Sequence, residues 1–193
     1  MFSLEEKLSF INVNQEYLKY LHDFCSEVYY KPFDYENKPY LGILINSDGK
    51  KYVLPLSSAK EKHKSWKNIE ADRFLIYENC DISVLSKSAV YKANADGSVK
   101  HIFSVLDLKK MIPVKDGLYK KVNLNSEEGD SVQIRNYKNL LNKEYSFCLK
   151  IIDTIIQKAT KLYDKQMKTG RIIPFCCNFK LLEAKCEEYC GNG

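Results

Sequence analysis

The sequence contains no apolar stretch long enough to span a membrane, and residues 1–7 lack the apolar core of a signal peptide. It also contains no internal repeat, no low-complexity segment and no linker-like run. These absences exclude an integral membrane protein and argue against a chain divided into several domains. We therefore expect one domain over residues 1–193 that works in the cytoplasm without a membrane partner.

Histidine is scarce, with three residues, and no two of them are arranged as an acid and base pair. No carboxylate cluster is spaced to hold Mg²⁺. The seven cysteines are an odd number scattered along the chain, which predicts reduced thiols. The last four, Cys176, Cys177, Cys186 and Cys190, have a spacing that matches no standard zinc pattern. The sequence therefore predicts no metal and no other cofactor.

Tyrosine, in contrast, is abundant: there are 14, against one tryptophan, and the net charge is +5. Tyrosine beside lysine is how proteins hold single-stranded RNA, since bases stack on rings and ammonium groups bind phosphates. Any single tyrosine is more often a packing residue in a core. The composition thus favours a polyanionic partner without identifying it.

Residues 40–67 organise the rest of the chain. Two apolar runs, 40–45 and 52–56, flank the turn residues at 46–49, which predicts a β-hairpin. The second strand ends at Ser57 and Ser58, and a segment rich in lysine follows, containing also His63 and Trp66. Hydroxyl, imidazole and ammonium groups at the end of a rigid element make this the place to expect chemistry.

Ser58 and Glu61 also form the capping-box pattern S-x-x-E. In that interpretation Ser58 is a helix N-cap and Glu61 reaches back to its amide. The two interpretations are compatible, because the free amides of a helix N-terminus attract phosphate. Lys60 would then stand beside the phosphate, with His63 about one turn further on.

The remaining patterns predict further strands and helices. Strands are expected at 8–13, at 73–77 before a polar turn at 78–81, at 88–92 and 99–103 as a hairpin, at 105–114 with an interruption, and as an edge at 119–124. Helices are expected after Asn14, as one helix or a helical pair with an apolar face of about thirty residues in a region that opens at Ser131 and ends at Gly170, and at 180–189 after Asn178. The chain is therefore predicted to be α+β, a twisted and partly closed antiparallel sheet with helices around it.

Four segments together resemble a known family. The most specific is P-L-S-S-x-K at 55–60, followed by C-N-F-x-L-L-E at 177–183, Y-L-G-I at 40–43 and L-K-K-M-I-P at 108–113. In order and approximate spacing they are similar to the ToxN/AbiQ family, the toxins of type III toxin–antitoxin systems. The resemblance runs from about Phe10 to Tyr189. This chain differs by extra residues around 86–103, where the additional hairpin is predicted.

The resemblance implies a fold, an activity and a partner. The fold would be similar to the MazF/Kid toxins, a small SH3-like barrel with added helices, one of them a long helical segment in the C-terminal half. The activity would be metal-independent endoribonuclease cleavage. The partner would be a small antitoxin RNA from a tandem-repeat transcript that the toxin itself cuts, in a closed protein–RNA assembly. The biology would be abortive phage defence, with cellular or phage RNA as substrate.

RNA carries its own nucleophile, the 2′-OH, so orientation and charge stabilisation can supply most of the rate. The products would be a 2′,3′-cyclic phosphate and a 5′-OH. Lys60 is expected to stabilise the phosphate oxygens, while Ser57 and Ser58 hold the phosphate or relay the proton. The other catalytic candidates, for positioning or proton transfer, are Tyr35, Lys38 and His63.

A wider set of residues is expected to bind the RNA around this site. Tyr29 and Trp66 would stack bases, although Trp66 also suits a core position. The expected basic contacts are Lys62, Lys64, Lys67, Lys109, Lys110, Lys120 and Lys121. Each lysine taken singly also suits a solvated face or a protected sheet edge. The alternative function is a non-catalytic single-stranded RNA-binding module, and no helix-turn-helix pattern supports DNA binding.

Overall fold

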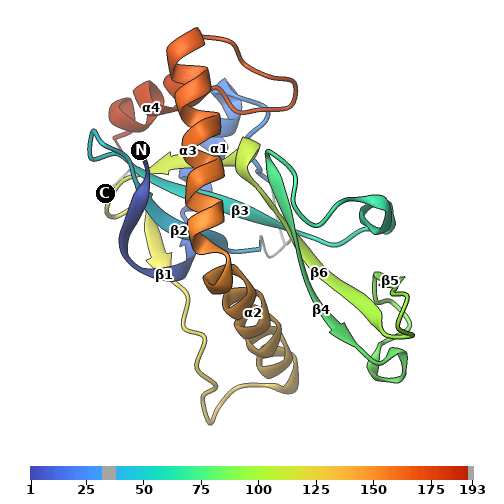
Figure 1. The fold of residues 1–193 in the computed structure, drawn as a ribbon. Coiled ribbons are helices and arrows are strands. Elements are labelled where there is room, and N and C mark those ends of the chain that lie inside the picture. The colour runs from blue at the N-terminus through green and yellow to red at the C-terminus, as the bar shows by residue number, and fades with distance from the viewer. Residues whose placement is uncertain (32–37, 191–193) are drawn as a thin grey trace.

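The computed structural model describes residues 1–31 and 38–190 (Figure 1). Within these residues the elements follow in the order β1 (Ser3–Val13), α1 (Gln15–Phe24), β2 (Tyr40–Ile45), β3 (Lys51–Ser58), the 3₁₀ turn η1 (Glu61–Ser65), β4 (Arg73–Cys80), η2 (Ile82–Val84), β5 (Tyr91–Ala93), β6 (Val99–Asp107), η3 (Leu108–Lys110), β7 (Ile112–Val114), β8 (Tyr119–Lys121), α2 (Val132–Lys150), α3 (Ile152–Thr169) and α4 (Phe179–Glu188). The α+β prediction is confirmed.

Strand β3 belongs to two antiparallel sheets. Its first part pairs with β2 and β7, and its last part, Leu56–Ser58, pairs with β6. The full order is β4-β6-β3-β2-β1-β8, with β5 added to β6 and β7 to β3. Figure 1 shows the result: β4, β5 and β6 form an arm that leaves the helix-covered body at the end of β3.

The β2–β3 hairpin forms as predicted, and local chemistry explains why. The Asn46 side-chain oxygen accepts hydrogen bonds from the amides of Asp48 (3.0 Å) and Lys50 (2.9 Å), and Gly49 takes the positive φ of 77° that the turn requires. Gly42 serves the pairing itself, since a Cβ there would lie 2.9 Å from the Val53 side chain. Glycine thereby lets the two strands approach closely.

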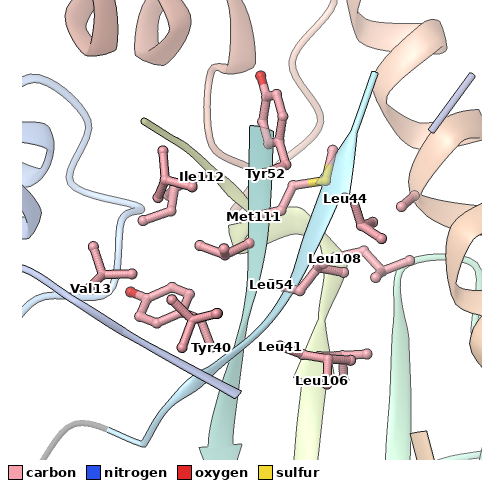
Figure 2. Close-up of a cluster of buried hydrophobic side chains, with 14 of the residues drawn as sticks. Val13, Tyr40, Leu41, Leu44, Tyr52, Leu54, Leu106, Leu108, Met111 and Ile112 are labelled. Atoms are coloured by element: carbon pink, nitrogen blue, oxygen red, sulfur yellow. The ribbon is translucent and has the colours of Figure 1, made fainter. Parts of the chain in front are cut away.

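The main core lies between the sheet and the helices. Figure 2 shows its centre, where side chains of β2, β3, β6, η3 and β7 meet: Tyr40, Leu41, Leu44, Tyr52, Leu54, Leu106, Leu108, Met111 and Ile112. Full burial of one such aliphatic side chain stabilises the fold by about 1.5–3 kcal/mol. A smaller cluster of Leu75, Ile102 and Val105 holds the arm together. β3 therefore leaves one core and enters the edge of another.

The helices begin and end where their caps predict. Asn14, Ser131 and Asn178 accept from the first-turn amides of α1, α2 and α4, and Gly170 ends α3 in the left-handed region. The long predicted helical segment is two helices, because the backbone at Ile151 leaves helical geometry. α2 packs against β1, β4 and β6, and α4 packs against β7 and α1.

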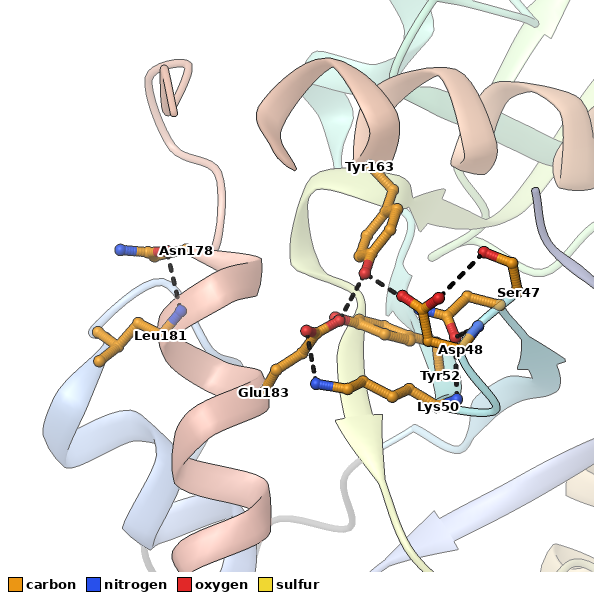
Figure 3. Close-up of polar contacts among 9 residues, drawn as sticks. Ser47, Asp48, Lys50, Tyr52, Tyr163, Asn178, Leu181 and Glu183 are labelled. Atoms are coloured by element: carbon orange, nitrogen blue, oxygen red, sulfur yellow. Dashed lines mark hydrogen bonds and ion pairs between the residues drawn. The ribbon is translucent and has the colours of Figure 1, made fainter. Parts of the chain in front are cut away.

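A buried polar network fastens α4 to the sheet. Glu183 of α4 accepts from the hydroxyls of Tyr52 (2.8 Å) and Tyr163 (2.7 Å) and pairs with the Lys50 ammonium at 2.8 Å. Figure 3 shows how these groups converge from α4, β3, α3 and the β2–β3 turn. Burial, with the Glu183 charge acting in the same direction, raises the pKa of the Tyr52 hydroxyl well above its usual value. Both hydroxyls therefore remain donors to one carboxylate.

Three expectations need correction or remain open. β1 begins at Ser3 rather than Leu8, and β4 continues to Cys80 through the turn predicted at 78–81, because these residues pair with β6. The SH3-like barrel, similar to MazF and Kid, is not confirmed: among the described residues, the pairing order ends at β4 and β8 without joining them. None of the helices in the described ranges is long and apolar enough to cross a membrane.

Candidate active site

The two serines lie where β3 passes from one sheet into the other. Ser57 is opposite Val105, and Ser58 is opposite Ser104 of β6. The amide of Ala59 still donates to the Phe103 carbonyl at 3.2 Å, so the ladder holds the strand to its end. Ser57 is half-buried and Ser58 is exposed. The sequence correctly predicted this rigid, hydroxyl-bearing strand end.

Across the ladder from Ser58 lies a residue that sequence reasoning missed. Ser104 is fully buried, and its hydroxyl has no hydrogen-bond partner within the described part of the chain. A buried hydroxyl without a partner is costly, so such a group merits an explanation. Only the β3–β6 register identifies it, since nothing in the sequence around 104 sets this serine apart from others.

The predicted capping box at Ser58 is wrong. The segment after β3 is a five-residue 3₁₀ turn that begins at Glu61, with Lys60 as its N-cap. Ser58 remains in the β ladder, and Glu61 pairs with Lys64 at 2.7 Å rather than with the Ser58 amide. Because this turn is too short to act as a helix terminus, it provides no dipole for phosphate binding. An anion here would be held by side chains, those of Ser58 and Lys60 among them.

His63 fixes the backbone of Lys60. The amide of Lys60 donates to His63 Nδ1 at 3.0 Å, and the His63 amide donates to the Lys60 carbonyl at 2.8 Å. Nδ1 is therefore an acceptor and the ring is neutral. Burial, then the charges of Lys62, Lys60 and Arg73, lower the His63 pKa below 6.5. This imidazole, which is only 3% exposed, holds Lys60 in place.

This arrangement makes stability depend on His63 protonation. A lowered folded-state pKa means that the contribution is present above the unfolded value of about 6.5 and is lost as pH falls below it. Melting temperature should therefore drop between about pH 7.5 and 5.5 more steeply in the wild type than in His63→Asn, which keeps an acceptor but cannot titrate. His101 is unchanged in both proteins, so parallel melting profiles would contradict this account.

Trp66 is part of a packed stack instead of an open platform. Its ring lies 4.4 Å from the His63 ring, and the Arg73 guanidinium lies 4.0 Å from its centroid. It also packs against the arm cluster of Leu75 and Val105. The structure thus supports the core interpretation of Trp66, while the prediction that it stacks an RNA base is not tested by these contacts.

The other wall of the site comes from residues distant in sequence. The side chains of Tyr29 and Ser57 lie close enough to interact, and the Tyr40 hydroxyl donates to the Tyr29 carbonyl at 3.3 Å. Tyr29 is 38% exposed, and its partial burial, with the charge of Asp107 acting in the same direction, raises its pKa to about 12. The phenol is protonated at neutral pH and holds its proton more tightly than an ordinary tyrosine does.

Asp107, at the end of β6, is the second group that the sequence did not reveal. Its carboxylate accepts from the Lys109 amide at 3.0 Å. Burial raises its pKa above 3.8, although the charges of Lys109 and Lys110 oppose the rise. Perturbed carboxyl groups gather at functional sites, which makes Asp107 a candidate through its effect on Tyr29. Its position just before the L-K-K-M-I-P segment was the available signal.

Lys38 is present, but its charge is already paired. Its ammonium lies 2.6 Å from Glu144 of α2, a fully buried carboxylate whose second oxygen has no partner among the described residues. Lys38 also lines an open cleft of about 990 Å³ together with Tyr40 and Lys120. Tyr35 lies outside the described residues. The structure thus brings Lys38 and Lys120 to one cleft.

The predicted basic contacts fall into two groups. Lys60, Lys62 and Lys67 are exposed and make no ion pair with any described residue. Most of the other predicted lysines already pair with a carboxylate. Lys109 pairs with Asp72 at 3.2 Å, the buried Lys110 pairs with Glu27, Lys121 pairs with Glu6 at 2.6 Å, and Lys64 lies 5.3 Å from the Tyr91 ring centroid besides pairing with Glu61. Of the predicted contacts, Lys60, Lys62 and Lys67 therefore remain available to an anion in the segment after Ser58, and the exposed Lys120 remains available in the cleft beside Lys38.

Among the described residues, one group has the composition of a metal site. Glu78, Cys80 and His101, on facing strands β4 and β6, place one ligand atom each within 4.8 Å of one another. The Lys143 ammonium lies 2.6 Å from Glu78 and supplies the positive charge that a cation would bring. The four C-terminal cysteines are not part of this group. It lies on the arm, away from the serine end of β3.

The fold and the site define an α+β protein with a polar, basic surface at the end of a strand shared by two sheets. The chain belongs to the ToxN toxin family: the family described as "Toxin ToxN, type III toxin-antitoxin system" matches residues 9–187. It is 27% identical over 187 residues to endoribonuclease ToxN of Bacillus thuringiensis subsp. kurstaki, covering 93% of this chain and 83% of that protein.

Two solved structures have the same fold. One comes from a study of selective toxin inhibition by a non-coding RNA pseudoknot in type III toxin–antitoxin systems. It matches with a TM-score of 0.67 and 25% identity, covering 95% of this chain and 98% of that one. The other is AbiQ, a lactococcal anti-phage endoribonuclease, with a TM-score of 0.64, 25% identity and the same coverages.

Proposed function

We propose that this protein is an endoribonuclease toxin whose cleavage site is the surface formed by Ser57, Ser58 and Lys60. The observation that carries the proposal is the exposed hydroxyl and ammonium pair of Ser58 and Lys60, held by the β3–β6 ladder and by His63. Membership of the ToxN family and the relatives named endoribonucleases support the same activity. Preorganised donors of this kind stabilise developing charge effectively.

In the proposed reaction the 2′-OH of the substrate attacks the adjacent phosphorus. The bond from phosphorus to the 5′-oxygen breaks, which leaves a 2′,3′-cyclic phosphate and a 5′-OH. Lys60 stabilises the non-bridging oxygens and Ser58 hydrogen-bonds the phosphate. Tyr29, which lies beside Ser57, donates the proton that the departing 5′-oxygen needs, the proton of the 2′-OH passes to water, and water reprotonates the phenolate. Lys38 and Tyr35 remain proposed positioning residues.

The products test this mechanism. Purified protein should cut a long single-stranded RNA at discrete sites in the presence of EDTA, and the fragments should carry a cyclic phosphate and a 5′-OH. A substrate with a single 2′-deoxy residue at the cut site should resist cleavage, because the nucleophile is missing. Efficient cutting of that substrate would rule out 2′-OH attack. RNA binding with no cuts at all would favour the non-catalytic binding module instead.

We further propose that a small antitoxin RNA, cut from a repeat transcript by the toxin, occupies this site and holds the protein in a closed assembly during phage defence. The RNA pseudoknot that inhibits the structural relative and the anti-phage activity of AbiQ support this. Lys60, Lys62 and Lys67 would contact its phosphates. The cytoplasm is the proposed compartment, in keeping with the free thiols of all seven cysteines.

A further inference from the structure

The loop between α3 and α4 contains a turn that breaks a local rule. The Cys176 amide donates to the Ile173 carbonyl at 3.2 Å, which closes a four-residue turn with Pro174 at its second position. The third residue, Phe175, has a φ of 61°, a conformation that glycine or asparagine normally supplies in such turns. An aromatic side chain there is strained, and strain of this kind gathers at functional positions.

The strained residue is also exposed. Phe175 has 70% of its surface open to solvent, although burial would stabilise so large an apolar ring. Neither packing nor backbone preference therefore accounts for phenylalanine at this position. A ring kept on the surface at the cost of strain is most simply explained by a contact that it makes with a partner.

Hydrogen bonds fix the backbone that follows the turn. The Gln166 side chain, only 5% exposed, donates to the Cys177 carbonyl at 3.0 Å and accepts from the Phe179 amide at 2.7 Å. The Cys177 amide donates to the Lys109 carbonyl at 2.8 Å, which ties the loop to η3. A ring presented by such a base loses little conformational entropy when it binds.

The loop that carries the turn lies against η3, which follows Asp107. Burial raises the pKa of the Cys176 thiol to about 12, and the charges of Asp107, Lys109 and Lys110 act on the same thiol. Phe175 lies two residues before Cys177, whose amide bonds to the Lys109 carbonyl of η3, and η3 directly follows Asp107. Exposed basic residues flank it along the chain: Lys168, Arg171 and Lys180. An exposed ring among cations is the arrangement on which single-stranded nucleic acids stack.

We propose that Phe175 is a stacking platform for an unpaired base of the RNA bound at this site. The inference rests on the proposed function only in taking RNA as the ligand, and it is tested by binding, independently of cleavage. Stacking needs the flat face of the ring and an unpaired base. The contribution should therefore be retained by other aromatic residues and be absent for duplex RNA.

The experiment measures Kd by fluorescence anisotropy in the Ser58→Ala background, with labelled single-stranded oligoadenylate and an RNA duplex as probes. Phe175→Ala should weaken single-strand binding about tenfold and leave duplex binding unchanged. Phe175→Gly should show the same loss with a raised melting temperature, because glycine relieves the strain. Phe175→Trp should bind as the parent does. Ile172→Ala, an exposed apolar residue of the same loop, is the matched control.

The outcomes separate the two proposals. Parental single-strand affinity in Phe175→Ala would overturn the stacking role and leave the cleavage proposal intact; a protein partner for this ring would give that result. An equal loss in Ile172→Ala, or an equal loss for the duplex, would also overturn it. Failure of every variant and of the parent to bind RNA would remove the proposed function as well.

Discussion

Replacing Lys60 with alanine is expected to lower kcat/KM for RNA cleavage by about two to three orders of magnitude while leaving the fold intact. The loss is large because a preorganised ammonium acts on charge that develops only in the transition state. The fold should survive because the Lys60 side chain is exposed and its contact with His63 uses the backbone amide. Single-turnover cleavage and a melting curve together measure both effects.

Ser58→Ala is the companion change, and the structure simplifies its interpretation. Ser58 is an exposed ladder residue and not a helix cap. Its replacement should therefore not lower the free energy of unfolding by the roughly 1 kcal/mol that a removed N-cap costs. Lys87→Ala, another exposed lysine that lies on the arm, controls for net charge. Wild-type cleavage by a folded Lys60→Ala protein would remove Lys60 from the mechanism.

The sequence predicted the parts of this site that local chemistry determines. The β2–β3 hairpin follows from its two apolar runs and the Asn46–Gly49 turn, and the three asparagine and serine caps follow from their positions before apolar patterns. The position of the strand end at Ser57 and Ser58 can therefore be predicted from the sequence. So is the break from regular structure at Gly170, where a left-handed residue is needed.

The remaining parts depend on which segments meet, and no local pattern encodes that. Tyr29 lies 28 residues before Ser57 in the chain, and the charge of Asp107 acts on Tyr29 because β6, which ends at Asp107, pairs with the last residues of β3. The S-x-x-E pattern failed at Ser58 for a related reason. The ladder with Ser104 outcompetes a helix start, and His63 supplies the acceptor for the turn instead.

At Phe175 the sequence departs from a local preference that the backbone conformation would normally impose. Pro174 followed by a residue at positive φ predicts glycine or asparagine at 175, and the chain has phenylalanine. Natural sequences depart from local preference chiefly where function requires it. Reading the departure as a signal requires the structure, because the sequence alone does not show that the ring is exposed.

Glu183→Ala is the change expected to cost most stability. It would remove the acceptor shared by the hydroxyls of Tyr52 and Tyr163, two residues that are 0% and 8% exposed. Each buried donor left without a partner costs about 1–3 kcal/mol, so the free energy of unfolding should fall by about 2–5 kcal/mol. The lost ion pair with Lys50 adds less to this cost, since a third of the Lys50 side chain is exposed and its ammonium can be solvated by water.

Urea denaturation of a set of variants would isolate the network. Glu183→Gln keeps one side-chain oxygen and should lose less than Glu183→Ala, and Tyr52→Phe in the Glu183→Ala background should recover stability because it removes an orphaned donor. A loss in Glu183→Ala below about 1 kcal/mol would show that the network does not hold α4. Cleavage per folded molecule should be unchanged, because Tyr52 precedes Ser58 by six strand residues, or about 20 Å.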